Sequence, residues 1–305
     1  MPDQGGPVVA IDVGGTAIKG AVVGPGGEIL SSSRWVTPVA AGPDAVVATV
    51  LSAVEEMLAA TPDAAAIGVV VPGSVDEDAG IGLWSENIGW RDVPFRRLIE
   101  ERVSVPVGFG HDVRAGGIAE REQGSGAEFS DTLFLPIGTG ISGAMCVEGR
   151  FVGGRNSGEI GHISTGFPDV CVCGATGCLE AIASGASIAR RYAAAGGAPH
   201  SAAEVAGLAA SGDAVAEGIW TDAIEALARA LTTYTSILAP ELIVLGGGVS
   251  AAGDALLLPL RHRLHALLSW QDEPQLIVSR LGDNASCLGA AILARRAINP
   301  ADKDA

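Results

Sequence analysis

The chain has 305 residues, a length typical of two domains. Hydrophobic residues make up 48% and charged residues 18%, a balance that supplies an apolar core and excludes disorder over most of the chain. The 19 basic and 35 acidic residues give a net charge of −16, which argues against binding to nucleic acids or anionic membranes.

The start of the chain shows no export signal, because residues 1–13 carry no basic residue and no long apolar run. The most apolar stretch, residues 230–249, is interrupted by Pro240, Glu241 and three glycines, which disfavours a membrane span. We therefore expect a cytoplasmic protein that contacts no membrane.

Apolar residues recur with the periods of alternating strands and helices, which indicates an α/β fold. The first part of the chain is predicted to contain strands at 8–13, 18–23, 29–36, 65–71 and 105–109, and helices at 43–60, 93–102 and 112–123. The pattern then starts again, with predicted strands at 132–137, 142–147, 241–245 and 275–278. Helices are predicted over 180–239, with interruptions near 196–199 and at Gly212, and at 255–268 and 286–296.

One segment of the chain is repeated. Residues 15–21 and 138–144 share five of seven positions, and each copy lies between two apolar strands. Chance could produce so short a match in a glycine-rich chain, but the shared strand context favours duplication. We therefore predict two related domains, each carrying a β-hairpin with a Gly-Thr turn.

The first hairpin has the composition of a phosphate-binding turn. Backbone N–H groups of Gly14 and Gly15 can surround phosphate oxygens, and Thr16 adds a hydroxyl. Asp12, at the end of the preceding strand, could hold Mg²⁺ through water. Lys19 lies in the same motif and is a further candidate for nucleotide binding. The alternative for this segment alone is a structural tight turn.

The second hairpin offers the same groups through Thr139 and Gly140. A third glycine site, Gly246, Gly247 and Gly248, follows an apolar strand and presents bare backbone to a flat group such as adenine or ribose. A loose strand-to-helix turn is the alternative for this third site.

Asp112 follows an apolar strand and opens a helix, where its carboxylate could accept a proton from a substrate hydroxyl. Asp is also a common helix N-cap, which is the structural alternative. His111 beside it is either a ligand contact or a loop residue.

The most specific signal is a cluster of metal-binding residue types. The spacing C-x-C-x₄-C brings Cys171, Cys173 and Cys178 around one point, and His162 lies nine residues upstream. Three thiolates and one imidazole form a closed set for a structural Zn²⁺ ion. The alternative is free, reduced thiols. The two other cysteines are expected to be small core residues.

These motifs together resemble the ROK family of sugar kinases and sugar-responsive repressors, in particular its zinc-containing, glucokinase-like members. The resemblance covers nearly the whole chain. The motifs that carry it are DxGGT at 12–16, GTG at 138–140, ExGH at 159–162, CxCGxxGCxE at 171–180 and LGGG at 245–248.

The resemblance implies an actin-like, ribonuclease-H-like fold with two related α/β domains around a central cleft. We expect a small domain at 1–118, joined by the C-terminal helix 286–298, and a large domain with the zinc-binding loop at 119–285. The cofactors implied are ATP, Mg²⁺ and a structural Zn²⁺. Family members of this kind often form homodimers or higher homo-oligomers.

The implied reaction is ATP-dependent phosphorylation of a hexose, usually on its 6-hydroxyl, with Asp112 as the general base. The resemblance also implies which residues line the sugar: Gly73, Asn87, His111, Asp112, Glu159, His162 and Glu180. His162 would then both bind zinc and contact the sugar.

The chain departs from the family pattern at His111, where Asn is usual. An imidazole offers one donor and one acceptor where an amide offers two of each, so this position leaves open which sugar or epimer is preferred, with glucose as the first expectation. The alternatives are a kinase for another hexose or an N-acetylhexosamine, a polyphosphate-dependent kinase, or a catalytically silent sugar sensor. A DNA-binding repressor is not expected, because only eleven residues precede Asp12.

Overall fold

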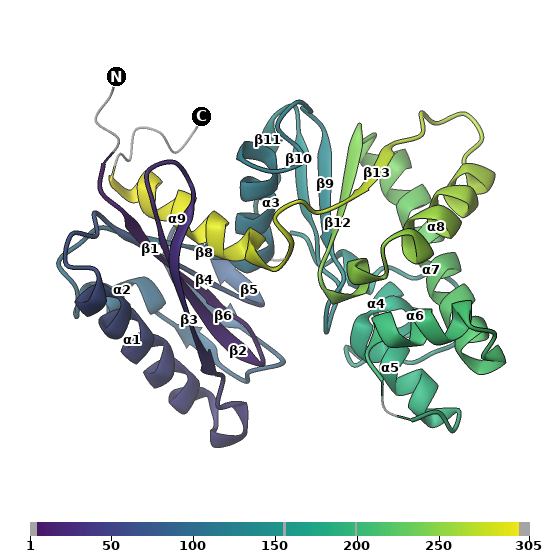
Figure 1. Cartoon of the computed structure of the whole chain (residues 1–305), viewed down its shortest axis with the longest axis horizontal. Helices are drawn as coiled ribbons and strands as arrows, with labels where there is room; N and C mark the ends of the chain where they lie inside the picture. The colour runs from purple at the N-terminus through teal and green to yellow at the C-terminus, as the bar shows by residue number, and fades with distance from the viewer. Residues whose placement is uncertain (1–4, 155–156, 199, 299–305) are drawn as a thin grey trace. The chain divides into compact units, whose positions relative to one another are not determined.

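The computed structural model describes residues 5–154, 157–198 and 200–298, and the chain divides into two compact units (Figure 1). Within the described residues, unit 1 comprises 5–119, 153–154 and 284–298, and unit 2 comprises 120–152, 157–198 and 200–283. Each unit has its own hydrophobic core.

Unit 1 is built on a five-stranded sheet in the order β3-β2-β1-β4-β8. Its strands are β1 (Val8–Val13), β2 (Ala17–Val23), β3 (Ile29–Val36), β4 (Ile67–Val71) and β8 (Val107–His111). The first three strands are antiparallel neighbours, whereas β1, β4 and β8 run parallel. The carboxyl ends of the three parallel strands therefore meet at one edge of the sheet.

Helices cover both faces of this sheet. They are α1 (Pro43–Ala60), α2 (Phe95–Glu100) and α9 (Ala285–Ile298), and unit 1 also includes most of α3 (Asp112–Glu122). Apolar side chains at alternate strand positions, such as Ile11 and Val69, join α1 in the core of unit 1. The opposite face is covered by α9, shown in yellow in Figure 1, which contacts β1, β4 and β8.

Glycines allow α9 to approach the sheet closely. A Cβ on Gly68 would lie 1.8 Å from the carbonyl oxygen of Ala290, and one on Gly108 would lie 2.3 Å from that of Leu293. Neither glycine has room for a side chain, because the helix backbone occupies the space.

A three-stranded sheet, β5 (Ser74–Asp76), β6 (Ile81–Trp84) and β7 (Arg91–Val93), was not expected from the sequence. Its strands are too short to show a clear period. The predicted start of a helix at Val93 was wrong, because the residue before a proline prefers an extended conformation and α2 begins only after Pro94. Strand β8 also lies two residues later than predicted and ends next to Asp112.

Unit 2 repeats the strand arrangement of unit 1. Its sheet has the order β11-β10-β9-β12-β13. The strands are β9 (Thr132–Pro136), β10 (Ala144–Val147), β11 (Arg150–Phe151), β12 (Leu242–Gly246) and β13 (Gln275–Val278). An antiparallel hairpin followed by two parallel strands occurs in both sheets, as the predicted duplication requires. Strand β10 starts at Ala144, two residues later than predicted. Before it, Ile137 and Ile141 form an isolated antiparallel bridge.

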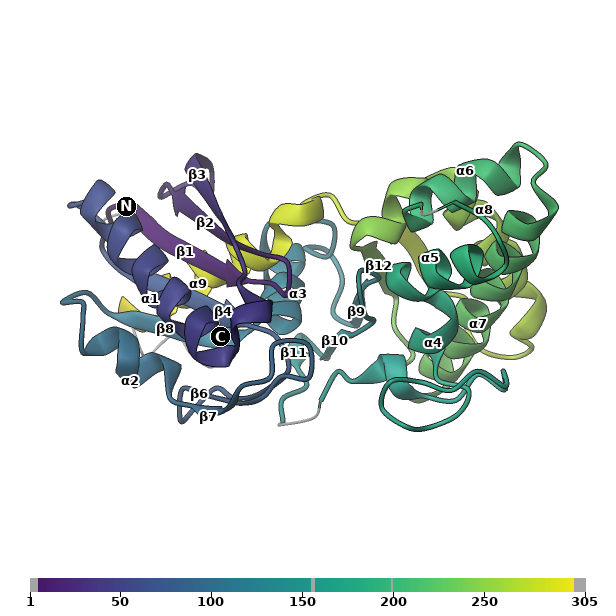
Figure 2. The same ribbon diagram turned by 90° about the horizontal axis from the view of Figure 1, so that it is seen from below.

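The helical section predicted over 180–239 consists of the four helices α4 to α7. They pack together with a fifth helix, α8, as Figure 2 shows. The five are α4 (Leu179–Ala183), α5 (Gly185–Ala194), α6 (Ala202–Ala210), α7 (Ala214–Leu238) and α8 (Asp254–Leu267). Ser184, Ser201 and Asp213 cap the starts of α5, α6 and α7. Pro199, in one predicted interruption, lies outside the described residues. No helix within the described ranges is long and apolar enough to cross a membrane.

We predict that Gly68→Ala lowers the free energy of unfolding by about 3 kcal/mol, because the new methyl group overpacks the contact with α9. The matched control is Gly218→Ala in α7, where a Cβ meets nothing within 4 Å. This control should gain up to about 1 kcal/mol from its higher helix propensity. Urea unfolding measures both variants. Equal stability of the two would contradict the close helix–sheet contact.

Candidate functional site

The first predicted phosphate hairpin is formed by β1 and β2. The Gly14 N–H donates to the Ala17 carbonyl oxygen at 3.0 Å, and Gly15 and Thr16 at the tip are exposed. Asp12 and Lys19 face each other across the two strands, with Oδ2 and Nζ 3.8 Å apart. The turn therefore combines exposed backbone amides, a hydroxyl, a cation and a nearly buried carboxylate.

Further predicted residues lie at the carboxyl edge of the parallel strands of unit 1. Gly73 follows β4, and a Cβ there would lie 2.2 Å from the Trp84 carbonyl oxygen, with φ at +92°. The exposed Asn87 has its Cβ 4.0 Å from a Cβ built on Gly15, so it lies beside the first hairpin. Asp112 follows β8 at the same edge.

Asp112 is the first residue of α3, and its Oδ1 accepts the Val113 N–H at 2.7 Å. Its side chain is 21% exposed, whereas that of the neighbouring His111 is 5% exposed. The Nε2 atom of His111 lies 3.5 Å from Asp112 Oδ1, and its Nδ1 accepts the Arg114 N–H at 3.3 Å. This pattern assigns the proton of a neutral ring to Nε2.

Two charged residues that the sequence analysis did not single out complete this group. Glu77 Oε1 accepts hydrogen bonds from the His111 backbone N–H and from Arg114 Nε, each at 3.0 Å. Burial, and secondly the charge of Arg114, lower the pKa of His111 to about 3. Because the imidazole is neutral, its contact with Asp112 is not an ion pair. Glu77 lies in a segment without a predicted element, so no sequence signal indicated it.

In unit 2 the second hairpin and the glycine triplet lie together. The Ile137 N–H donates to the Gly246 carbonyl oxygen, and the Val249 N–H donates to that of Ile137. A Cβ on Gly247 would lie 2.6 Å from the Ile137 backbone. Thr139 and Gly248 are exposed. The predicted nucleotide-binding residues of unit 2 thus lie close together, with Thr139 and Gly248 exposed and Gly246 buried.

Glu180 in α4 connects this surface to the segment before the cysteines. Its Oε2 accepts the Ile141 N–H at 2.8 Å and lies 2.6 Å from a Cβ built on Gly140. Residues around Glu159 pack on the same hairpin, since the Gly143 N–H donates to the Gly158 carbonyl oxygen at 2.8 Å. In unit 2, the residues predicted to bind the sugar are therefore adjacent to those predicted to bind the nucleotide.

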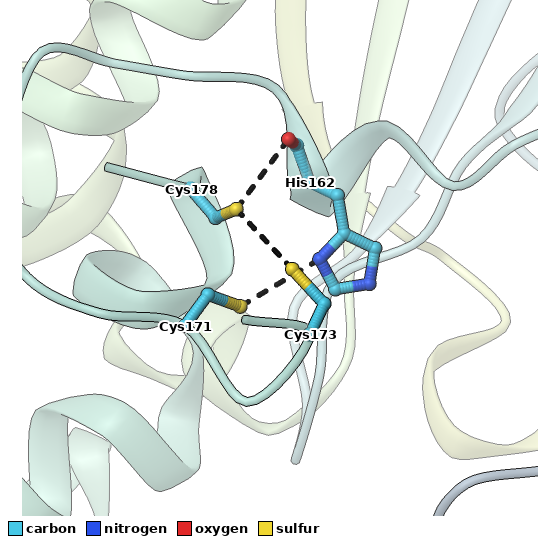
Figure 3. Close-up of side chains that lie close together, drawn as sticks. All are labelled: His162, Cys171, Cys173 and Cys178. Atoms are coloured by element: carbon cyan, nitrogen blue, oxygen red, sulfur yellow. Dashed lines mark hydrogen bonds between the residues drawn. The ribbon is translucent and has the colours of Figure 1, made fainter. Parts of the chain in front are cut away.

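His162, Cys171, Cys173 and Cys178 point toward one another, as Figure 3 shows. Their ligand atoms all lie within 4.8 Å of one another. Cys173 Sγ is 3.7 Å from Cys178 Sγ, and Cys171 Sγ is 3.7 Å from His162 Nδ1. A tetrahedral Zn²⁺ with bonds of about 2.3 Å to sulfur separates its ligand atoms by about 3.8 Å. The distances thus fit a metal ion, and they are too long for a disulfide.

The electrostatics of the thiols are consistent with this fit. Burial raises the pKa of Cys171, and it raises that of Cys178 to about 12. A hydrogen bond from the Ala175 backbone lowers the pKa of the exposed Cys173. Three thiolates so close together repel one another, so their joint ionisation requires a cation. His162 Nε2 lies 4.0 Å from Glu159 Oε2, on the other side of the ring.

The predicted site residues thus form two sets. Unit 1 contains Asp12, Gly14, Gly15, Thr16, Lys19, Gly73, Asn87, His111 and Asp112. Unit 2 contains Thr139, Gly140, Glu159, His162, Cys171, Cys173, Cys178, Glu180, Gly246, Gly247 and Gly248. The roles assigned to these residues stay predictions.

The chain is similar to known proteins over nearly its whole length. A sequence model of the ROK family matches residues 8–297. A glucokinase from Halalkalibacterium halodurans is 32% identical, covering 97% of each chain. A ROK family glucokinase from Streptomyces griseus, solved in complex with glucose and AMPPNP, has a TM-score of 0.84 and 29% identity over 95% of this chain and 100% of its own. A ROK hexokinase from Thermus thermophilus has a TM-score of 0.81 and 32% identity over 96% of this chain and 99% of its own.

We predict that His111 makes the protein less stable in acid. Its pKa is about 3 in the folded chain and near 6.5 when unfolded, so below pH 6.5 the unfolded state binds a proton that the folded state does not. Stability is therefore full above pH 6.5 and falls toward pH 3. Between pH 7 and pH 5 this amounts to about 2 kcal/mol. Urea unfolding measures the free energy of unfolding at both pH values. Its drop from pH 7 to pH 5 should be smaller by that amount in His111→Phe than in the unmodified chain, and equal drops would refute the low pKa of His111.

Proposed function

This chain belongs to the ROK family and is an ATP-dependent sugar kinase that phosphorylates a hexose; we propose that the hexose is glucose and the acceptor its 6-hydroxyl. The observation that carries the proposal is the full-length similarity to a glucokinase structure that holds glucose and AMPPNP. The fold class expected from the sequence, an actin-like pair of α/β domains, is confirmed by the same similarities.

Asp112 is the proposed general base. A sugar hydroxyl is a weak acid, and phosphoryl transfer proceeds through a loose transition state in which positioning and charge neutralisation do most of the work. Asp112 needs only to orient the hydroxyl and accept its proton as the bond to phosphorus forms. Its place at the start of α3, partly exposed and held by the Val113 N–H, supports this role.

ATP is proposed to bind to the two Gly-Thr hairpins and the glycine triplet. The exposed amides of Gly15 and Thr139 suit phosphate oxygens, and the open backbone at Gly248 suits the nucleoside. The carboxylate of Asp12, paired with Lys19, would hold Mg²⁺ through water. When bound, Mg²⁺ neutralises charge on the transferred phosphoryl group.

The sugar is proposed to contact Glu159, His162 and Glu180 from unit 2, and Gly73 and Asn87 from unit 1. The cluster of His162, Cys171, Cys173 and Cys178 is proposed to bind one structural Zn²⁺. Since His162 Nε2 faces Glu159, the metal would fix the orientation of two sugar-binding residues at once.

The alternatives to glucose are another hexose or an N-acetylhexosamine. A catalytically silent sensor is not favoured, because Asp112 is present at the expected place. We further propose that the protein works in the cytoplasm, and that it forms a homodimer or higher homo-oligomer as the family resemblance implies.

The proposed base predicts that Asp112→Asn keeps the fold and sugar binding but lowers kcat by about 1,000-fold or more, because the amide accepts no proton. Coupled-enzyme detection of ADP over glucose, mannose, allose, fructose, N-acetylglucosamine and N-acetylmannosamine measures this effect and identifies the substrate. Asp254→Asn, at the start of α8 and outside the site, is the matched control. Substantial turnover by the Asp112 variant would exclude it as the base.

The metal site predicts one zinc per chain by elemental analysis. Cys173→Ser should lose the metal and lower the melting temperature, because the binding energy of a structural zinc contributes to folding. Cys146→Ala, which removes a buried cysteine outside the cluster, should keep the full zinc content. Unchanged zinc in the Cys173 variant would argue against this ligand set.

A further inference from the structure

The imidazole of His111 is buried where a sugar contact would have to be accessible. Its side chain is 5% exposed, and both ring nitrogens already face protein groups. Nδ1 accepts the Arg114 backbone N–H at 3.3 Å, and Nε2 lies 3.5 Å from Asp112 Oδ1. The ring therefore faces the proposed base.

The backbone of His111 and the side chain of Arg114 are held by one carboxylate. Glu77 holds the His111 backbone N–H and the Arg114 guanidinium through the same carboxylate oxygen, Oε1. Arg114 is itself only 6% exposed. Glu77 directly follows β5, so one short turn fixes both the end of β8 and the first turn of α3.

The protonation state of the ring determines what it offers to Asp112. With Nδ1 accepting a hydrogen bond, the neutral ring carries its proton on Nε2 and presents an N–H to Oδ1. Asp112 Oδ1 also accepts the Val113 N–H at 2.7 Å. The Val113 N–H and the Nε2 atom thus lie near the same oxygen, and catalytic hydrogen bonds are often long before substrate binds.

We propose that His111 is a positioning residue, whose Nε2–H holds Asp112 Oδ1 while Glu77 and Arg114 lock the ring, so that the carboxylate keeps one orientation toward the sugar hydroxyl. The proposal rests on the proposed function of Asp112 as general base. It also gives His111 a role through Asp112 in place of direct contact with the sugar.

A matched pair of substitutions isolates the Nε2–H donor. His111→Gln places an amide N–H near the position of Nε2, whereas His111→Phe keeps the ring volume without a donor. Neither variant has a ring nitrogen at the Nδ1 position that accepts the Arg114 N–H, and only the Gln variant offers an N–H to Asp112, so the comparison reports that donor. His262→Phe, an exposed histidine on α8, controls for the substitution itself.

The expected result is a kcat at least tenfold lower for His111→Phe than for His111→Gln, since hydrogen bonds to charged groups carry effects of this size. The KM for the sugar should agree within about twofold between the two. In an Asp112→Asn background, His111→Phe should lower the residual turnover no further, because the two residues act as one unit.

Equal kcat values for the two variants would overturn the proposal. A raised KM for the sugar with unchanged kcat would also overturn it, and would assign His111 to direct sugar contact. Failure of the proposed function is distinguishable, because it would appear as Asp112→Asn retaining the turnover of the unmodified chain.

Discussion

The parallel pairing of β4 between β1 and β8 decides where the chemistry of unit 1 lies. Asp12 and Gly110 both pair with Val70, so they are two strands, or about 10 Å, apart at the same edge. The chain leaves this edge through Gly73 after β4 and through Asp112 after β8. Glycines in β4 and β8 let α9 pack closely against the back of these strands. The packing of α9 on one face of the sheet thus supports the strands whose carboxyl ends carry the predicted site residues.

In unit 2 the cluster of His162 and three cysteines is connected to the second hairpin through α4. Cys178 immediately precedes α4, and Glu180 in the first turn of this helix accepts the Ile141 N–H of the hairpin. A metal ion that fixes Cys178 would therefore also fix the position of Glu180 and the backbone near Gly140. Through this connection, the proposed structural ion would influence substrate binding without a part in phosphoryl transfer.

Motifs with fixed spacing could be predicted from the sequence, whereas contacts between distant segments could not. The cysteine spacing correctly indicated a cluster with His162, and the repeat around Thr16 and Thr139 correctly indicated two similar sheets. The buried contact of Glu77 with Arg114 depends on a turn in a small sheet whose strands are too short to show a period. His111 is buried beside that contact, whereas the sequence left it as either a ligand contact or a loop residue and the family resemblance implied a sugar contact.

As an ATP-dependent sugar kinase, the chain transfers the terminal phosphoryl group of ATP to a hexose hydroxyl. The most direct test of this transfer is ³¹P and ¹³C NMR of a reaction containing the protein, glucose, ATP and Mg²⁺. We expect a phosphomonoester on carbon 6, formed in a one-to-one ratio with ADP. ADP formed without a sugar phosphate, or no reaction with glucose or any other hexose, would contradict the account.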